Sequence, residues 1–174
     1  CSAGPAFEAG DISCGMRATH GAVEAVQIDR DTMEPTLRIV GAEGQKPVGI
    51  CGSGIIDVIA ELYRTSIISA KGQFVREGRR VQFDHHGMGR YILAFPEESE
   101  TGREISITGV DIDSFIRAKG AIFSAINIML SSLDMDVSVL EHVYVAGGIG
   151  SGINMENAVR IGMFPDIDRS LFEY

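Results

Sequence analysis

The sequence predicts an α/β fold in which a mixed sheet packs against helices. Three observations carry this prediction: a helical apolar repeat after residue 52, a longer one after residue 108, and a short apolar strand pattern at residues 143–146. Strand segments that alternate with helices are typical of layered folds of this class. With 174 residues, of which 45% are hydrophobic, the chain can bury a core of useful size.

The first part of the chain has the pattern of short strands joined by turns. Residues 12–28 contain strand-like stretches that Gly15 and Gly21 interrupt, and residues 36–41 form another strand pattern after a turn at 33–35. We therefore expect a meander of short strands in this region.

The segment GICGSGIIDVIAELYRTSII, residues 49–68, changes to a helical period. Apolar residues recur three and four positions apart, and Ser53 is a suitable N-cap. The sequence thus predicts a helix that starts at Ser53 and ends before Ile67. The residues that carry the repeat are Ile55, Ile56, Ile59, Leu62 and Tyr63.

Residues 72–104 are predicted to form an insertion that contains a hairpin. The part from 72 to 90 is charged and rich in glycine, so we expect an exposed, mobile segment with two short strands at most. YILAF (91–95) and EISIT (104–108) flank a polar, acidic turn, which is typical of a β-hairpin.

The strongest helix signal follows this hairpin. Thr108 with Asp111 three residues later predicts a capping box, and apolar residues at helical spacing continue to Leu133. A buried strand at 143–146, a glycine loop at 147–152 and a short helix at 154–161 are expected next.

Composition excludes several classes of function. The net charge of −9 repels a phosphate backbone, so we expect no nucleic-acid partner. No apolar run reaches the length of roughly 18 residues that a membrane span needs, so no membrane partner is expected. The cysteines Cys1, Cys14 and Cys51 are too widely spaced for a disulfide framework, which favours a reducing, cytoplasmic compartment.

Neither an iron–sulfur cluster nor another metal site is expected in this chain. Three scattered cysteines cannot supply the four ligands of a cluster. The adjacent His85 and His86 would point to opposite faces of a strand, which is poor geometry for one metal ion.

Two glycine-rich stretches are compatible with nucleotide binding. In VYVAGGIGSG (143–152), Gly147, Gly148 and Gly150 surround Ile149 where a strand leaves the sheet, so either a ligand lies on the backbone or the turn is only tight. In GICGSGIID (49–57), Gly52, Ser53 and Gly54 open a helix whose N–H groups could hold an anion. Ser53 could equally serve only as a cap, and Asp57 only as a first-turn carboxylate.

Two carboxylates near the start of the chain are weak catalytic candidates. Glu8 and Asp11 lie in the glycine-containing loop SAGPAFEAGDISCGM, residues 2–16. Either side chain could coordinate Mg²⁺ through water or orient an attacking water, and either could be a solvated loop carboxylate.

Five segments, in this order, resemble the C-terminal ATPase domain of the reductive activators of corrinoid proteins, an iron–sulfur redox protein family. Its ATPase belongs to the superfamily of acetate and sugar kinases, heat-shock chaperones and actin. The segments are AGPAFE…ISCGMRATHGAVEAV, PVGICGSGIIDVIAELY, ITGVDIDSFIRAKGAIFSAI, VYVAGGIG and AVRIGMFPD. The resemblance implies a ribonuclease-H-like (actin-like ATPase) subdomain that belongs to a larger protein.

This resemblance also implies which part of that protein the chain would form. Residues 1–174 would form most of the second of two subdomains that enclose ATP and Mg²⁺. Both phosphate loops and an N-terminal domain with a 2Fe–2S cluster are expected upstream of Cys1. AGGIG (146–150) matches the adenosine loop, and GICGSG (49–54) resembles the helix-opening turn beside the nucleotide cleft.

The implied activity is the ATP-dependent return of Co(II) corrinoid proteins to Co(I). The partner would be a corrinoid protein, and a homodimer is compatible with the sequence. We expect the chain alone to be inactive, because it offers only the adenosine side of the cleft. Alternatives from the same superfamily are a small-molecule kinase or an acyl-CoA dehydratase activator, and a third is a non-catalytic nucleotide-sensing module.

Overall fold

The structure, a computed structural model, describes residues 12–145 and 152–173. The first sheet has the order β2-β1-β3, with β1 (Ala22–Ile28) in the centre. β1 pairs antiparallel with β2 (Pro35–Ile39) and parallel with the two-residue β3 (Gly49–Ile50), so the sheet is mixed. The expected meander is wrong for residues 12–21, where only an isolated bridge joins Gly15 to Ile50.

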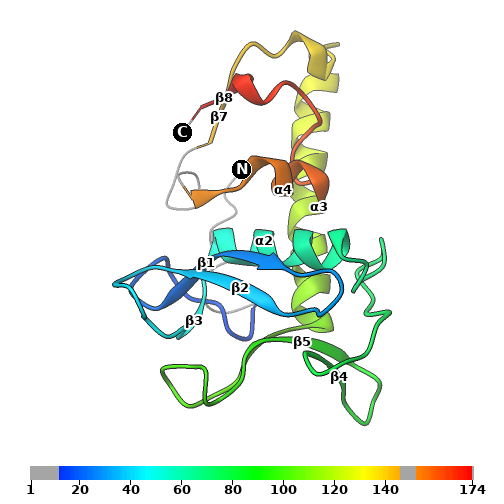
Figure 1. The fold of residues 1–174 in the computed structure, drawn as a ribbon. Coiled ribbons are helices and arrows are strands. Elements are labelled where there is room, and N and C mark those ends of the chain that lie inside the picture. The colour runs from blue at the N-terminus through cyan, green and yellow to red at the C-terminus, as the bar shows by residue number, and fades with distance from the viewer. Residues whose placement is uncertain (1–11, 146–151, 174) are drawn as a thin grey trace.

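Helix α2 (Gly52–Arg64) packs directly on β1 (Figure 1). Every residue from Gly52 to Leu62 is buried, so this helix has no solvent-exposed face until its last turn. It ends at Arg64, before Ile67 as predicted, but its N-cap is Cys51, two residues before the predicted cap Ser53. Ser53 is therefore not the cap, because its hydroxyl lies in the first turn and donates to the Glu24 carbonyl at 2.9 Å.

The second sheet has the order β4-β5-β6 and is entirely antiparallel. Its strands are β4 (Val81–Phe83), β5 (Gly89–Ala94) and β6 (Ile105–Thr108). The pairing of β5 with β6 confirms the predicted hairpin. The expected surface exposure of residues 72–90 is wrong at Arg80 and Val81, which are 5% and 2% exposed, because Arg80 is enclosed by two carboxylates from outside the segment.

Helix α3 (Gly109–Ser131) begins with the predicted capping box. The Asp111 amide donates to Thr108 Oγ1 at 3.2 Å, and the Thr108 amide donates to Asp111 Oδ2 at 2.8 Å. The buried residues of this helix lie between Asp111 and Ile122, Ile126 still packs against the core, and the last part of the helix extends beyond α2 (Figure 1). The apolar repeat predicted to continue to Leu133 is not buried at its end, since Met129 and Leu133 are 65% and 67% exposed.

The last part of the chain forms a two-stranded parallel sheet and one helix. β7 (Val143–Tyr144) pairs with β8 (Phe172–Glu173), and α4 (Met155–Arg160) lies between them in the sequence and confirms the predicted short helix. Short 3-10 turns, η1 (Val137–Val139) and η3 (Arg169–Leu171), precede each strand. The expectation of a buried strand at 143–146 is wrong over its described residues, because β7 has β8 alone as neighbour and Tyr144 is 72% exposed.

A single hydrophobic core joins both three-stranded sheets to the helices. It is built from β1, α2, β5, β6, the first half of α3 and α4. α2 is buried between β1 and α4, and its first turn contains Gly52, Ser53 and Gly54 of the first predicted glycine-rich stretch. None of the helices in the described parts of the chain is long and apolar enough to span a bilayer.

Candidate functional site

The start of α2 lies against the end of the predicted glycine loop. A Cβ atom added to Gly152 would lie 3.3 Å from Ser53 Oγ, so the backbone that leaves the loop contacts the first turn of α2. Two predicted stretches that are about a hundred positions apart in the sequence thus meet in space. Gly147, Gly148, Ile149 and Gly150 themselves lie outside the described residues, as do Glu8 and Asp11.

The backbone at the start of α2 is held close to β1. The Cys51 amide donates to the Val23 carbonyl at 3.1 Å, and the Cys51 side chain makes no capping bond with the helix. A Cβ atom at Gly54 would lie 2.2 Å from that same Val23 oxygen. Glycine at position 54 is thus required for helix and strand to approach each other, whether or not a ligand binds.

Two carboxylates of α2 accept amide protons from the open part of β1. The Val26 amide donates to Asp57 Oδ2 at 3.4 Å, and the Ile28 amide donates to Glu61 Oε2 at 2.8 Å. β3 pairs with β1 only at Ala22 and Val23, the first two residues of β1, so the amides of Val26 and Ile28 have no strand neighbour on that side. The spacing of four residues places both carboxylates on the same face of α2.

Asp57 also connects α2 to α4. Asn157 Nδ2 donates to Asp57 Oδ1 at 2.8 Å, and both residues are 5% exposed. Burial raises the pKa of the Asp57 carboxyl, and the hydrogen bonds from Asn157 and the Val26 amide partly oppose this rise. Because α4 follows the glycine loop, this contact ties the position of the loop's downstream end to α2 and β1.

Glu61 is stabilised as an anion by a different set of partners. Burial favours its neutral form, but the hydrogen bonds from Arg64 and the Ile28 amide outweigh burial and lower the pKa of Glu61. Arg64 Nε lies 2.6 Å from Glu61 Oε1, and Arg64 Nη2 donates to the Ile28 carbonyl at 2.7 Å. The end of α2 is therefore joined to the end of β1 by charge-assisted hydrogen bonds.

The described part of this region offers backbone groups and buried carboxylates that already have hydrogen-bond partners. Backbone N–H groups at a helix start favour an anion, and the contact of Gly152 with Ser53 brings the two backbone segments together. In the parts of the chain that the structure describes, no group of three His, Cys, Asp or Glu residues is arranged to hold a metal ion. His85 and His86 are exposed, with ring centroids 3.8 Å apart.

Two residues of the site were missed or misread in the sequence. Asp57 is not the first-turn carboxylate that the sequence allowed, because its carboxylate is buried between β1 and α4. Asn157 carried no recognisable signal, since its partner is a hundred residues away. The available clue was the pair Asp57 and Glu61 within an otherwise apolar helix, because buried carboxylates need hydrogen-bond partners.

Comparison with known proteins identifies the family. The sequence model described as the C-terminal domain of RACo, the ASKHA domain, matches residues 1–174. The chain belongs to this family. The expected actin-like ATPase class is thereby confirmed, since ASKHA is the superfamily of acetate and sugar kinases, heat-shock chaperones and actin.

The chain is also similar to a solved structure and to curated relatives. The structure of a reductive activator for corrinoid, iron–sulfur protein matches with a TM-score of 0.92 and 42% identity, over all of this chain and 28% of that chain. The corrinoid activation enzyme RamQ of Eubacterium limosum is 31% identical over 95% of this chain and 28% of its own length.

A third relative is the [Co(II) methylated amine-specific corrinoid protein] reductase of Methanosarcina barkeri, which is 25% identical over 99% of this chain and 32% of its own length. The chain therefore spans about a third or less of the relatives that it matches.

Proposed function

We propose that this chain is the adenosine-side part of an ATP-dependent reductive activator that returns Co(II) corrinoid proteins to Co(I). The observation that carries the proposal is the match of the whole chain, at 42% identity and a TM-score of 0.92, to a reductive activator for corrinoid, iron–sulfur protein. The other two relatives are a corrinoid activation enzyme and a Co(II) corrinoid protein reductase, which favours this activity over a small-molecule kinase or a nucleotide sensor.

In this proposal the chain forms most of the second actin-like subdomain, with residues 72–104 as an insertion. Gly147, Gly148, Ile149 and Gly150 face adenosine, and the backbone of residues 52–54 lines the cleft beside them. The contact between Ser53 and Gly152 supports this grouping, because it brings both backbone segments to one place.

The remainder of the longer protein supplies the other reactants. Its phosphate loops hold the triphosphate and Mg²⁺, and a 2Fe–2S cluster delivers the single electron that converts Co(II) to Co(I). ATP hydrolysis drives a change between two conformations that differ in their affinity for nucleotide. The partner is a cytoplasmic corrinoid protein.

The test uses the full-length protein and a single glycine substitution. Gly148→Val places a side chain where adenosine lies, so ATP affinity should fall by more than about 1.4 kcal/mol, or tenfold. Calorimetry measures ATP binding, the visible spectrum of the corrinoid follows Co(I) formation, and thermal unfolding without nucleotide shows whether the variant folds.

Gly120→Val is the matched control, because a Cβ atom at Gly120 would contact nothing within 4 Å. A folded Gly148→Val variant with normal ATP affinity contradicts the adenosine-loop assignment. A wild-type protein that binds ATP but never reduces a Co(II) corrinoid protein contradicts the proposed activity.

A further inference from the structure

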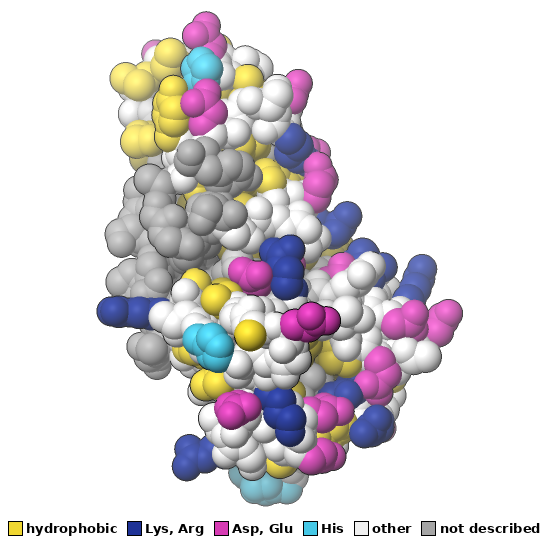
Figure 2. Space-filling model, turned by 60° about the vertical axis from the view of Figure 1, so that its left-hand side comes forward, with side chains coloured by type: hydrophobic (Ala, Val, Ile, Leu, Met, Phe, Trp, Pro, Cys, Tyr) yellow, Lys and Arg dark blue, Asp and Glu magenta, His cyan; other side chains and the backbone are white. Residues whose placement is uncertain are grey.

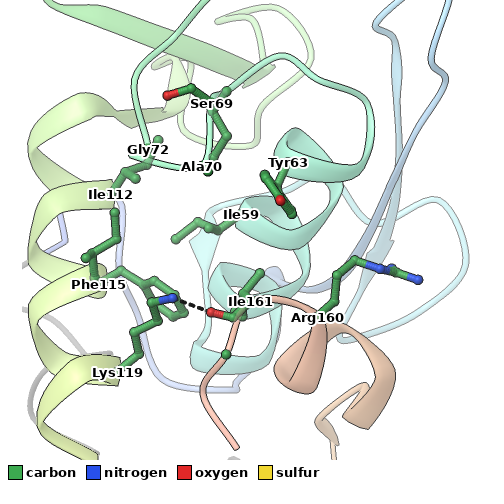
Figure 3. A pocket seen from close by; sticks show the side chains of 13 residues that line it. Ile59, Tyr63, Ser69, Ala70, Gly72, Ile112, Phe115, Lys119, Arg160 and Ile161 are labelled. Carbon is green, nitrogen blue, oxygen red and sulfur yellow. Dashed lines mark hydrogen bonds between the residues drawn. The ribbon is translucent and has the colours of Figure 1, made fainter. Parts of the chain in front are cut away.

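A cavity of about 290 Å³ lies away from the candidate nucleotide site (Figure 3). It is enclosed by the second half of α2, the loop at residues 68–72, the first half of α3 and the end of α4. Its walls are mainly apolar and include Ile59, Ile112, Phe115 and Ile116. None of the residues predicted from the sequence to bind nucleotide lines it.

Lys119 brings a positive charge into this apolar cavity. Its Nζ donates to the carbonyl oxygen of Ile161, the residue that ends α4, as Figure 3 shows. No Asp or Glu is among the residues that line the cavity, and burial lowers the pKa of Lys119. An ammonium group has three N–H donors, so two of them are left for an acceptor in the cavity.

The loop at residues 68–72 lies close to α3 at one side of the cavity. A Cβ atom at Gly72, which has φ +78°, would lie 2.7 Å from the Ile116 side chain, so only glycine allows the loop to approach α3 in this way. Arg160 lies at the edge of the cavity, but its guanidinium points away from Lys119 (Figure 3), and its Nη1 donates to Asn157 Oδ1 at 2.8 Å. The cavity therefore combines apolar walls with one cation, Lys119.

We propose that this cavity binds a small molecule that has an apolar body and one carboxylate, with the carboxylate on Lys119 and the body against the accessible side chains of Tyr63 and Ile116. A neutral apolar ligand would leave the ammonium without an acceptor in a partly desolvated space. A small inorganic anion would leave the apolar walls in contact with water. Only a molecule with both parts satisfies both surfaces.

The experiment measures the binding of benzoate to the full-length protein by calorimetry. Benzamide is the neutral probe of the same shape, and acetate is the carboxylate without an apolar body. We expect benzoate to bind at least tenfold more tightly than either. Lys119→Met should weaken benzoate binding at least tenfold.

Lys46→Met is the matched control, because Lys46 Nζ also donates to a backbone carbonyl, that of Glu97 at 3.0 Å, but Lys46 is exposed and is not among the residues that line the cavity. It should leave benzoate binding unchanged. If Lys119→Met fails to fold, Ala70→Phe provides the second test, because Ala70 is exposed at the edge of the cavity and a larger side chain there should block entry.

Four results overturn the proposal. These are undetectable benzoate binding, equal affinity for benzamide or acetate, unchanged affinity in a folded Lys119→Met or Ala70→Phe variant, and an equal loss in Lys46→Met. None of them depends on whether the protein activates a corrinoid protein.

Discussion

Gly54 shows how one residue in a suggestive motif can be required by packing alone. Glycine permits either a close approach or an unusual backbone conformation, and only the close approach applies here. The distance of 2.2 Å from a Cβ atom at this position to the Val23 oxygen is far inside van der Waals contact. Because the obstacle is backbone in a central strand, it cannot move aside as a flexible side chain would.

Gly54→Ala is therefore expected to destabilise the protein, by about 1–3 kcal/mol, as overpacked cores do. Gly120→Ala is the same substitution in α3, at a site with open space, and should stabilise by about 0.5–1 kcal/mol. Urea unfolding of both variants measures the difference. If Gly54→Ala unfolds like the wild type, helix α2 does not approach β1 as described.

The buried pair of Asp57 and Asn157 should make stability depend on pH. Burial raises the folded-state pKa of Asp57 above its ordinary value of 3.8, so the folded state binds a proton more readily than the unfolded state. Protonation of Asp57 therefore contributes to the free energy of unfolding. This contribution is fully present below the pKa that Asp57 has in the unfolded state, and it is lost as the pH rises through its pKa in the folded state.

Asn157→Ala removes a hydrogen bond to the ionised carboxylate and should destabilise the protein by about 1–3 kcal/mol at neutral pH. The cost should shrink as the pH falls through the raised pKa of Asp57, because the neutral acid needs that donor less. Urea unfolding at neutral and mildly acidic pH measures both values. Asn127→Ala, an exposed asparagine of α3, is the control, and an equal cost at both pH values would contradict the assignment.

At the scale of elements, the second sheet is attached to the first by a nearly buried arginine. The Arg80 side chain is 6% exposed and lies 2.7 Å from Glu34 Oε2 and 2.8 Å from Glu98 Oε2, between the β1–β2 turn and the turn after β5. Its guanidinium also lies 4.6 Å from the centre of the Phe95 ring. The hydrogen bonds from Arg80 lower the pKa of Glu98.

Arg80→Met should destabilise the protein by about 1–3 kcal/mol, because two carboxylates lose a charged partner but stay partly exposed to water. Arg79→Met is the neighbouring control and should cost about 0.5 kcal/mol or less, since Arg79 is 66% exposed and 3.6 Å from Glu34. Thermal unfolding compares the two. The difference in stability between the wild type and Arg80→Met should decrease as the pH falls through the lowered pKa of Glu98.

Sequence patterns predicted secondary structure well where the stabilising contacts lie between residues close in the sequence. The capping box of Thr108 and Asp111 needs only neighbouring residues, and both of its hydrogen bonds are present. Ser53 has the composition of an N-cap, but its hydroxyl bonds with Glu24, 29 residues away, and the helix begins at Gly52. A cap predicted from sequence fails where a distant acceptor competes for the side chain.

The candidate site was only partly predictable for the same reason. The two glycine-rich stretches, one at the start of α2 and one after β7, indicated where backbone could contact a ligand, and Ser53 and Gly152 from these stretches do lie together. The partnership of Asp57 with Asn157 depends on how α4 returns to α2, which no local pattern encodes. Tertiary contacts thus decided which polar residues of the apolar helix were structural.

At the scale of the whole molecule, the last part of α3 and the small parallel sheet are covered by no further sheet or helix layer among the residues that the structure describes. Figure 2 shows hydrophobic side chains gathered at one end of the molecule. The exposed apolar residues in this region include Ile128, Met129, Leu133, Val139 and Tyr144. Parallel sheets are normally covered on both faces, and two strands alone are marginally stable. A chain that spans 28% of a solved relative can lack the layers that the relative has.

The 174-residue chain, prepared by itself, should therefore self-associate. Ile128 and Leu133, at 68% and 67% exposure, lie in the second half of α3 and just after it. Replacing both with Lys should return the chain to a monomer and reduce its binding of a hydrophobic dye, because the added charges repel and the apolar area is lost. Sedimentation velocity measures the association. Lys substitutions at the exposed Asn127 and Ser131 are the control, since they add the same charge to the same helix without removing apolar surface. A wild-type chain that sediments as a monomer without binding the dye would show that this end of α3 needs no cover.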